Sequence, residues 1–256
     1  MNKNRRKGHP VCLSRAVLKA GALLAAAAAL CSCAANISGG LNAAGSGDFT
    51  VKAGLQPRVS TLIRSLKAFA GDTAPGSPVI DGPAIARSMD SAPGIASVSF
   101  RNSAPAAVEG QLRISRVGDF LAPAEGGPAG GGFVRFDQAA GSSGGRCTIS
   151  LSRESGPEIL SLVSADVSGY LEALMAPLAT GEALGRAEYL ELVSSVYGSE
   201  IADEISKARI KAAIEFPGPV QSVRGGTFSG SKAEFDIALV DLLVLEKPLS
   251  CEVVWK

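Results

Sequence analysis

The first 33 residues decide which part of this 256-residue chain is expected to fold. Residues 1–19 carry six cations and no acidic residue, and residues 20–30 form an uncharged run of Ala, Leu and one Gly. Such a run has the length of a signal-peptide core and is too short to cross a bilayer, which takes about 20 apolar residues. We therefore expect residues 1–32 to be a cleaved signal peptide and residues 33–256 to be the exported domain.

The cleavage site resembles the lipobox of bacterial lipoproteins. Leu30 is large and apolar, Ser32 is small, and Cys33 follows directly. This resemblance implies that Cys33 is the lipidation site and the first residue of the mature protein. It also implies attachment to the bacterial cell membrane or outer membrane, facing the periplasm or the exterior. The alternative, a buried alanine-rich helix at residues 20–30, would leave six cations beside a segment without a polar face.

Charge and apolar patterning limit the partners of the mature chain. Removal of six leader cations from the 25 Lys and Arg leaves 19, against 24 acidic residues, a formal net charge of −5. An acidic chain with scattered cations lacks the basic face that nucleic acid binding needs. No second apolar stretch reaches membrane-spanning length, so the lipid on Cys33 is the expected membrane anchor. The sequence identifies no protein partner.

The only histidine, His9, lies in the leader. Without an imidazole the mature chain cannot form a Ser-His-Asp or Cys-His catalytic pair, nor the usual zinc sites. Phosphate-binding loops, dinucleotide fingerprints and calcium loops are also absent from the sequence. We therefore expect no enzyme, no metal and no cofactor.

Two cysteines remain after Cys33, at positions 147 and 251. In an oxidising compartment Cys147 and Cys251 are candidates for a disulfide. The alternative is a pair of free thiols, since unpaired cysteines often behave as small core residues.

Hydrophobic periodicity predicts alternating groups of strands and helices in residues 33–256. Alternation at Ile37–Leu55 and Val98–Ile114 predicts two hairpins, and apolar spacing predicts a helix over 57–70 after Pro57. The remaining elements are expected as a short helix at 83–89, strands at 133–136, 146–151, 210–216, 235–245 and 249–255, and helices at 157–176, 183–197 and 200–207.

This order predicts an α+β fold with antiparallel sheet and helices packed on one face, because few strand connections contain a crossover helix. The Gly/Pro/Ala-rich stretch at residues 122–132 is the best internal boundary, and it would divide the domain into two lobes.

The C-terminal region carries a longer motif. Phe216-Pro217-Gly218 is followed by Val220, by Gly225-Gly226 and by Phe228 and Gly230, before an apolar strand. This run resembles the LppM-like family of bacterial lipoproteins. The resemblance implies an envelope α+β domain for which lipid binding, and no enzymatic role, has been proposed.

Three patterns invite a catalytic interpretation. Gly141–Gly145 matches G-x-S-x-G, and Ser229–Lys232 matches S-x-x-K, but neither has the helix that its chemistry requires. We interpret both as turns. The acidic residues Glu188, Glu191, Asp203 and Glu204 are interpreted as solvated faces of helices.

These observations favour a lipid-anchored envelope protein that binds or carries a lipid or another apolar ligand. The long apolar stripes of helices 57–70 and 157–176 suggest a pocket against the sheet, lined by Leu62, Leu66, Val167 and Leu171. The alternatives are full packing of both stripes and a structural or assembly lipoprotein that binds another envelope protein.

Overall fold

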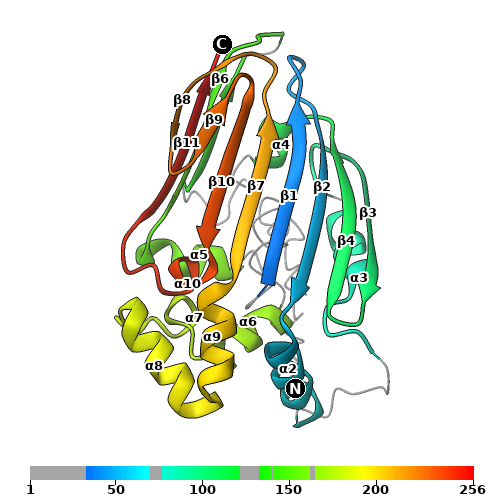
Figure 1. Cartoon of the computed structure of the whole chain (residues 1–256). Coiled ribbons are helices and arrows are strands. Elements are labelled where there is room, and N and C mark those ends of the chain that lie inside the picture. Colours follow the sequence, from blue (N-terminus) through cyan, green and yellow to red (C-terminus); the bar gives the residue numbers. More distant parts are fainter. Residues whose placement is uncertain (1–32, 70–76, 91, 122–132, 140, 162–164) are drawn as a thin grey trace, which may run out of the picture.

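The computed structural model describes residues 33–256 except 70–76, 91, 122–132, 140 and 162–164. Two β-sheets face each other, and helices gather mainly at one end of the strands (Figure 1). The predicted α+β class is confirmed. The helices lie at the end of the sheets rather than across one face. The predicted signal peptide, residues 1–32, lies outside the described residues.

The larger sheet has seven strands in the order β3-β4-β2-β1-β7-β10-β9. All its described pairs are antiparallel except β1 with β7, which run parallel. The strands are β1 (Cys33–Leu41), β2 (Gly47–Leu55), β3 (Ile95–Ala104), β4 (Ala107–Ile114), β7 (Arg209–Glu215), β9 (Thr227–Ser229) and β10 (Lys232–Ala238).

The hairpin of β1 and β2 is formed by local features of the sequence. Asn42 closes the turn between β1 and β2, because its side-chain oxygen accepts hydrogen bonds from the backbone N–H groups of Ala44 and Ser46. Gly45 has a φ of 77°, a conformation that glycine adopts without steric cost. The predicted hairpin at 37–55 is therefore confirmed, and it extends back to Cys33.

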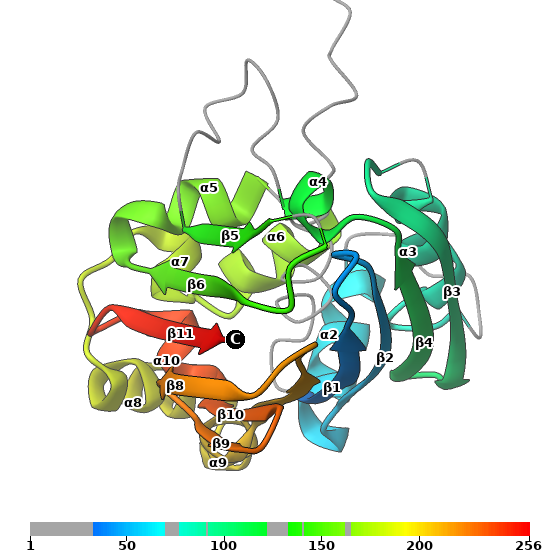
Figure 2. The same cartoon turned by 90° about the horizontal axis from the view of Figure 1, so that it is seen from above.

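The smaller sheet has four antiparallel strands in the order β5-β6-β11-β8. It lies opposite the larger sheet, and the view along the strands shows the two sheets enclosing an interior (Figure 2). The strands are β5 (Val134–Gln138), β6 (Gly145–Leu151), β8 (Val220–Arg224) and β11 (Leu249–Trp255).

Most helices lie near the end of β1 that begins with Cys33, whereas α3 packs beside β3 and α4 lies near the opposite end (Figure 1). The helices are α2 (Pro57–Phe69), α3 (Gly82–Met89), α4 (Val117–Leu121), α5 (Gly156–Ser161), α6 (Ala165–Ala173), α7 (Pro177–Thr180), α8 (Arg186–Tyr197), α9 (Ser199–Lys207) and α10 (Leu239–Val244), with a 3-10 turn, η1, at Arg153–Ser155.

Two predicted elements differ from the structure. The helix predicted over 157–176 is divided between α5 and α6, and Pro177 begins α7 instead of ending a long helix. The strand predicted over 235–245 ends at Ala238, where α10 begins. Every residue of α10 except Asp241 is buried, and a continuous apolar run does not distinguish a buried strand from a buried helix.

Both halves of the chain contribute to one structure. β1 from the first half pairs with β7 from the second, and one core cluster includes Val51 and Phe100 as well as Leu174 and Val240. The proposed boundary at 122–132 lies outside the described residues. The described residues on the two sides of this stretch share one sheet and one core cluster.

Candidate functional site

An apolar cavity of about 240 Å³ lies between the two sheets. Its walls come from the inner faces of β1, β2, β7 and β10 on one side and of β5, β6 and β11 on the other. The alternation of strand side chains places every second residue on this face, as with Ile210, Ala212 and Ile214 of β7. The cavity therefore follows directly from two sheets that face each other.

The side chains that surround this cavity are apolar. Its described lining residues are aliphatic or aromatic, apart from the thiols of Cys147 and Cys251, and they include no charged side chain. Burial of a charged or polar group without a partner costs several kcal/mol on water-to-alkane scales. The cavity therefore suits an apolar ligand or the apolar part of an amphipathic one.

An aromatic cluster closes the end of the cavity that is distant from Cys33. The ring centroid of Trp255 lies 4.6 Å from that of Phe216 and 6.0 Å from that of Phe136. Phe136 and Phe216 also line the cavity. Aromatic pairs at these separations are worth about 0.5–1.5 kcal/mol beyond their burial, so this end of the cavity has a firmly packed wall.

Both cysteines lie in the cavity wall as free thiols. In the register of β6 and β11, Cys147 faces Val253 and Cys251 faces Ile149, so the two thiols are diagonal neighbours. Diagonal positions on antiparallel strands are about 7–8 Å apart, whereas a disulfide needs Cα atoms about 4.4–6.8 Å apart. In the structure both cysteines are therefore free thiols, and the candidate disulfide between them is not formed.

Burial, and to a lesser extent the neighbouring Cys251 and Asp137, raise the pKa of Cys147 to about 11. Burial also raises the pKa of Cys251. A thiol with a raised pKa is a poor nucleophile at neutral pH, because the thiolate is the reactive form. These cysteines act as apolar wall residues.

The predicted pocket residues lie elsewhere. Leu171 is buried in the helical end with 1% of its surface exposed, and Leu62 and Leu66 are half-buried on α2. None of these three lines the cavity. The side chain of Val167 lies outside the described residues. The helices α2 and α6, on which these residues stand, pack at the end of the sheets, whereas the cavity described here lies between the sheets.

The two serine motifs are turns, as expected. Gly141-Ser142-Ser143-Gly144-Gly145 connects β5 to β6, with a φ of 77° at Gly141. Ser229–Lys232 connects β9 to β10 around Gly230, whose φ is 61°. The described residues contain no group of three or more His, Cys, Asp or Glu side chains that could hold a metal ion.

No protein-family model matches the sequence, and no curated protein matches it. The chain is similar to the folded domain of the LppM protein of Mycobacterium tuberculosis, solved by NMR. The two share 11% identity at a TM-score of 0.37, over 88% of this chain and 91% of that one.

The mature chain would begin directly in the larger sheet. Cys33 is the first residue of β1 and pairs with Leu55, the last residue of β2, one residue before Gln56 and the start of α2. An acyl group on Cys33 would therefore have no flexible tether. Among the described helices, none is long and apolar enough to cross a membrane.

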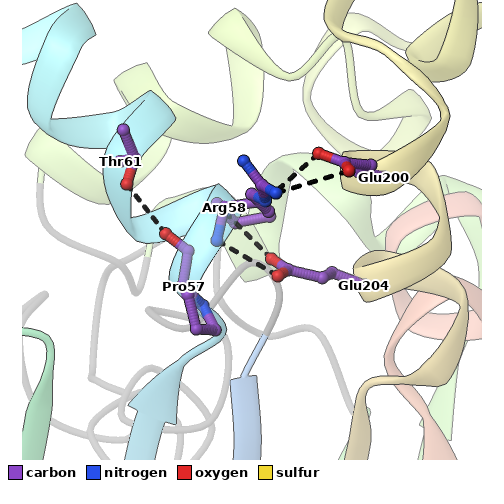
Figure 3. Close-up of polar contacts among 6 residues, drawn as sticks. Pro57, Arg58, Thr61, Glu200 and Glu204 are labelled. Atoms are coloured by element: carbon purple, nitrogen blue, oxygen red, sulfur yellow. Dashed lines mark hydrogen bonds and ion pairs between the residues drawn. The ribbon is translucent and has the colours of Figure 1, made fainter.

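A second helix fixes the start of α2. The carboxylate of Glu204 on α9 accepts hydrogen bonds from the backbone N–H groups of Arg58 and Val59, at 3.1 and 3.0 Å (Figure 3). Glu200, one turn earlier on α9, forms an ion pair with the Arg58 side chain at 3.1 Å. A carboxylate at a helix N-terminus satisfies free N–H groups and interacts favourably with the helix dipole. The interpretation of Glu204 as part of a solvated face was therefore wrong.

Replacing Glu204 with Ala is expected to lower the free energy of unfolding by about 1–2 kcal/mol, because two N–H groups lose their acceptor. Glu200→Ala is the matched control. Its ion pair is exposed, with 62% and 68% of the Arg58 and Glu200 side chains accessible, and such pairs contribute about 0–1 kcal/mol. Urea denaturation of both variants measures the difference. Equal losses would contradict the capping role.

Proposed function

We propose that this protein is a lipid-anchored envelope protein that binds a lipid or similar apolar ligand between its two sheets, without catalysing a reaction. The observation that carries the proposal is the cavity of about 240 Å³ with an apolar lining. The resemblance of residues 30–33 to a lipobox supports an acyl anchor on Cys33.

The energetics of the cavity support an occupant. Native cores contain few voids larger than a water molecule. An apolar chain that covers the apolar lining of this cavity removes that surface from water, which contributes about 25 cal/mol for each Å² buried.

The size of the cavity limits the ligand. At about 30 Å³ for each water-sized volume, 240 Å³ holds roughly eight such volumes. Since a methylene group is close to this size, the cavity suits one aliphatic chain of roughly eight to ten carbons. It is smaller than the range of about 300–1,000 Å³ typical of drug-sized ligands. We therefore propose one acyl-type chain as the occupant rather than a whole two-chain lipid.

The position of the proposed anchor supports the same function. Because Cys33 begins β1, whose inner face lines the cavity through Ile37 and Leu41, an acylated chain would hold the cavity close to a bilayer. A bilayer is a concentrated source of aliphatic chains. The absence of histidine from residues 33–256 supports a role in binding rather than in catalysis.

The alternative assembly role has less support. A protein-binding face is expected to expose a contiguous apolar patch of a few hundred Å². Among the described residues the exposed large apolar side chains are Val196, 53% exposed, and Phe228, 48% exposed. They belong to α8 and β9, which lie near opposite ends of the molecule (Figure 1).

A cavity-filling substitution tests the proposal. Ala212 of β7 points into the cavity, whereas the next residue, Ala213, points to the outer face of the same strand. We expect Ala212→Phe to reduce the bound lipid about tenfold and Ala213→Phe to leave it unchanged. Native mass spectrometry and organic-solvent extraction of the purified protein measure the bound lipid.

The melting temperature of Ala212→Phe distinguishes a blocked cavity from an overpacked core as the cause of a reduced lipid content. If the cavity has room for the ring, Ala212→Phe keeps the melting temperature of the parent. A fully packed interior would instead lose about 1–3 kcal/mol through overpacking. A parent protein that carries no lipid, and takes up none from vesicles, would overturn the proposal.

A further inference from the structure

Two clusters of buried apolar residues among the described residues meet at the cavity. The smaller cluster consists of Phe216, Val220, Ala233, Val253 and Trp255. Phe216 and Val253 line the cavity, whereas the other three members do not. Leu41, Phe136 and Ile214, which also line the cavity, pack against both clusters. The cavity therefore ends where the smaller cluster begins.

Two phenylalanine rings form this end wall, and packed atoms lie behind them. Phe136 and Phe216 line the cavity, and both rings pack on the indole of Trp255, which does not line it. Trp255 is 2% exposed, so the indole is also shielded from solvent. An added Cβ on Gly145 would lie 2.5 Å from Cζ2 of the indole, closer than real Cβ atoms approach. This end of the cavity is therefore closed.

The backbone holds Phe216 in the wall. The N–H of Phe216 donates a hydrogen bond to the carbonyl oxygen of Ser231 at 2.8 Å. Three residues later, the carbonyl oxygen of Pro219 accepts a hydrogen bond from the N–H of Lys256 at 3.1 Å. The corner that follows Phe216 is thus tied to two other segments, and in a close-packed interior the ring has little freedom to move aside for a ligand.

A row of inward side chains leads to this wall. Ala212, Ile214 and Phe216 are two residues apart, so they share a face of the extended chain, and all three line the cavity. A polar head group at the closed end would lose its contacts with water and gain no partner there. A chain bound in the cavity therefore points its terminal methyl group toward Phe216.

We infer that Phe216 and Phe136 determine the longest aliphatic chain that the cavity accepts, because the terminal methyl group of a bound chain stops against their rings. The ligand class is a straight chain with about ten carbons inside the cavity, and any further carbons remain outside with the head group. This inference rests on the proposed function, which supplies the apolar chain.

Calorimetric titration with a series of saturated fatty acids, from six to fourteen carbons, tests the inference. Each methylene that enters the cavity is expected to tighten binding about fourfold. In the parent protein this gain should stop at about ten carbons, the length that the cavity volume allows. In Phe216→Ala the gain should continue for about three more carbons, because the lost ring occupied roughly three methylene volumes.

The matched control is Phe100→Ala. Phe100 of β3 is as buried as Phe216, each with 6% of its surface exposed, but it does not line the cavity. Its replacement removes the same ring from the interior. We expect this variant to lose stability while the gain in affinity still stops at the parent chain length.

Val253→Phe tests the same wall in the opposite direction. Val253 lines the cavity and pairs with Cys147, which in turn pairs with Phe136. A ring added in this row should stop the gain in affinity about two carbons earlier than in the parent protein. This variant decides the question if Phe216→Ala does not fold.

The outcomes separate this inference from the proposed function. A chain-length limit that is the same in the parent, Phe216→Ala and Val253→Phe overturns the role of the rings and leaves the apolar cavity standing. A parent affinity that rises through fourteen carbons without a break does the same. A parent protein that binds no member of the series overturns the proposed function itself.

One measurement needs no variant. Trp255 is the only tryptophan in the sequence, and it packs directly behind the two rings. Bromine quenches indole fluorescence at short range. At saturation, decanoic acid with bromine on its terminal carbon should quench Trp255 several-fold more than decanoic acid with bromine next to the carboxylate. Equal quenching by the two probes would contradict the orientation of the chain and, with it, the end wall.

Discussion

Replacing Cys33 with Ser is expected to block lipidation and processing, leaving either a form that retains the leader or a soluble one. Without the thiol there is no acyl acceptor, and each buried methylene of a lipid anchor contributes about 0.8 kcal/mol of membrane affinity. The fold should be retained, because the contribution of Cys33 to the sheet is its backbone pairing with Leu55. Membrane fractionation and metabolic labelling with a fatty acid measure the effect.

Cys31→Ser is the matched control for this experiment. Cys31 lies two residues before the modified position, so its replacement should leave labelling and membrane attachment intact. Labelled fatty acid that appears equally in the Cys33→Ser protein would show that the lipobox interpretation is wrong.

Cys147 is expected to react with iodoacetamide about 100-fold more slowly in the folded protein than in the unfolded chain at pH 8. Burial raises the pKa of Cys147 from its ordinary value of 9.0 to about 11. At pH 8 the thiolate fraction is then about 0.1% in the folded state and about 9% in the unfolded state. Restricted access to the cavity wall slows the folded state further.

The pH dependence follows from the direction of this shift. As pH rises through 9, the unfolded chain becomes fully ionised while the folded protein continues to gain thiolate up to about pH 11. The ratio of the two rates should therefore fall to roughly tenfold at pH 10. Mass spectrometry of peptides from a Cys251→Ser variant follows the alkylation of Cys147 separately from that of the other cysteines.

A disulfide would give a different result. If Cys147 and Cys251 were bridged, neither would be alkylated even in urea without a reductant. Rapid labelling of Cys147 in the folded protein at pH 8 would instead contradict the buried position described above.

Local sequence patterns predicted the local elements well. The alternation over Ile37–Leu55 predicted the β1–β2 hairpin, and apolar spacing after Pro57 predicted α2. Helices α8 and α9 also lie within or close to their predicted ranges, because Gly198 interrupts the helical region between them. These features depend on residues that are close in sequence.

The long-range arrangement could not be predicted in the same way. The parallel pairing of β1 with β7 joins residues 175 positions apart in the chain, and no pattern within either strand encodes it. The position of the cavity depends on this pairing, because it determines which strands face β6 and β11. The apolar stripe of α2 was correctly identified, but its partners are other elements at the helical end.

The roles of two polar residues could not be predicted from the sequence either. Glu204 caps a helix that begins 147 residues earlier in the sequence, at Pro57, and nothing on α9 marks it for this role. Gln138, whose amide donates hydrogen bonds to the carbonyl oxygens of Asn42 and Ser142, lies in a strand next to a glycine-rich turn, where it has no distinctive pattern. Both become visible only when hydrogen-bond partners are assigned in three dimensions.

The direct entry of Cys33 into β1 has a consequence for the position of the cavity. The nine residues of β1, at about 3.3 Å per residue, carry the chain up to about 26 Å from Cys33 to the turn beside Gln138. This height is close to the thickness of the hydrocarbon core of a bilayer, about 30 Å. If Cys33 carries an acyl group, the turn beside Gln138 and the aromatic end of the cavity would lie at up to about this distance from the anchor, and not beside it.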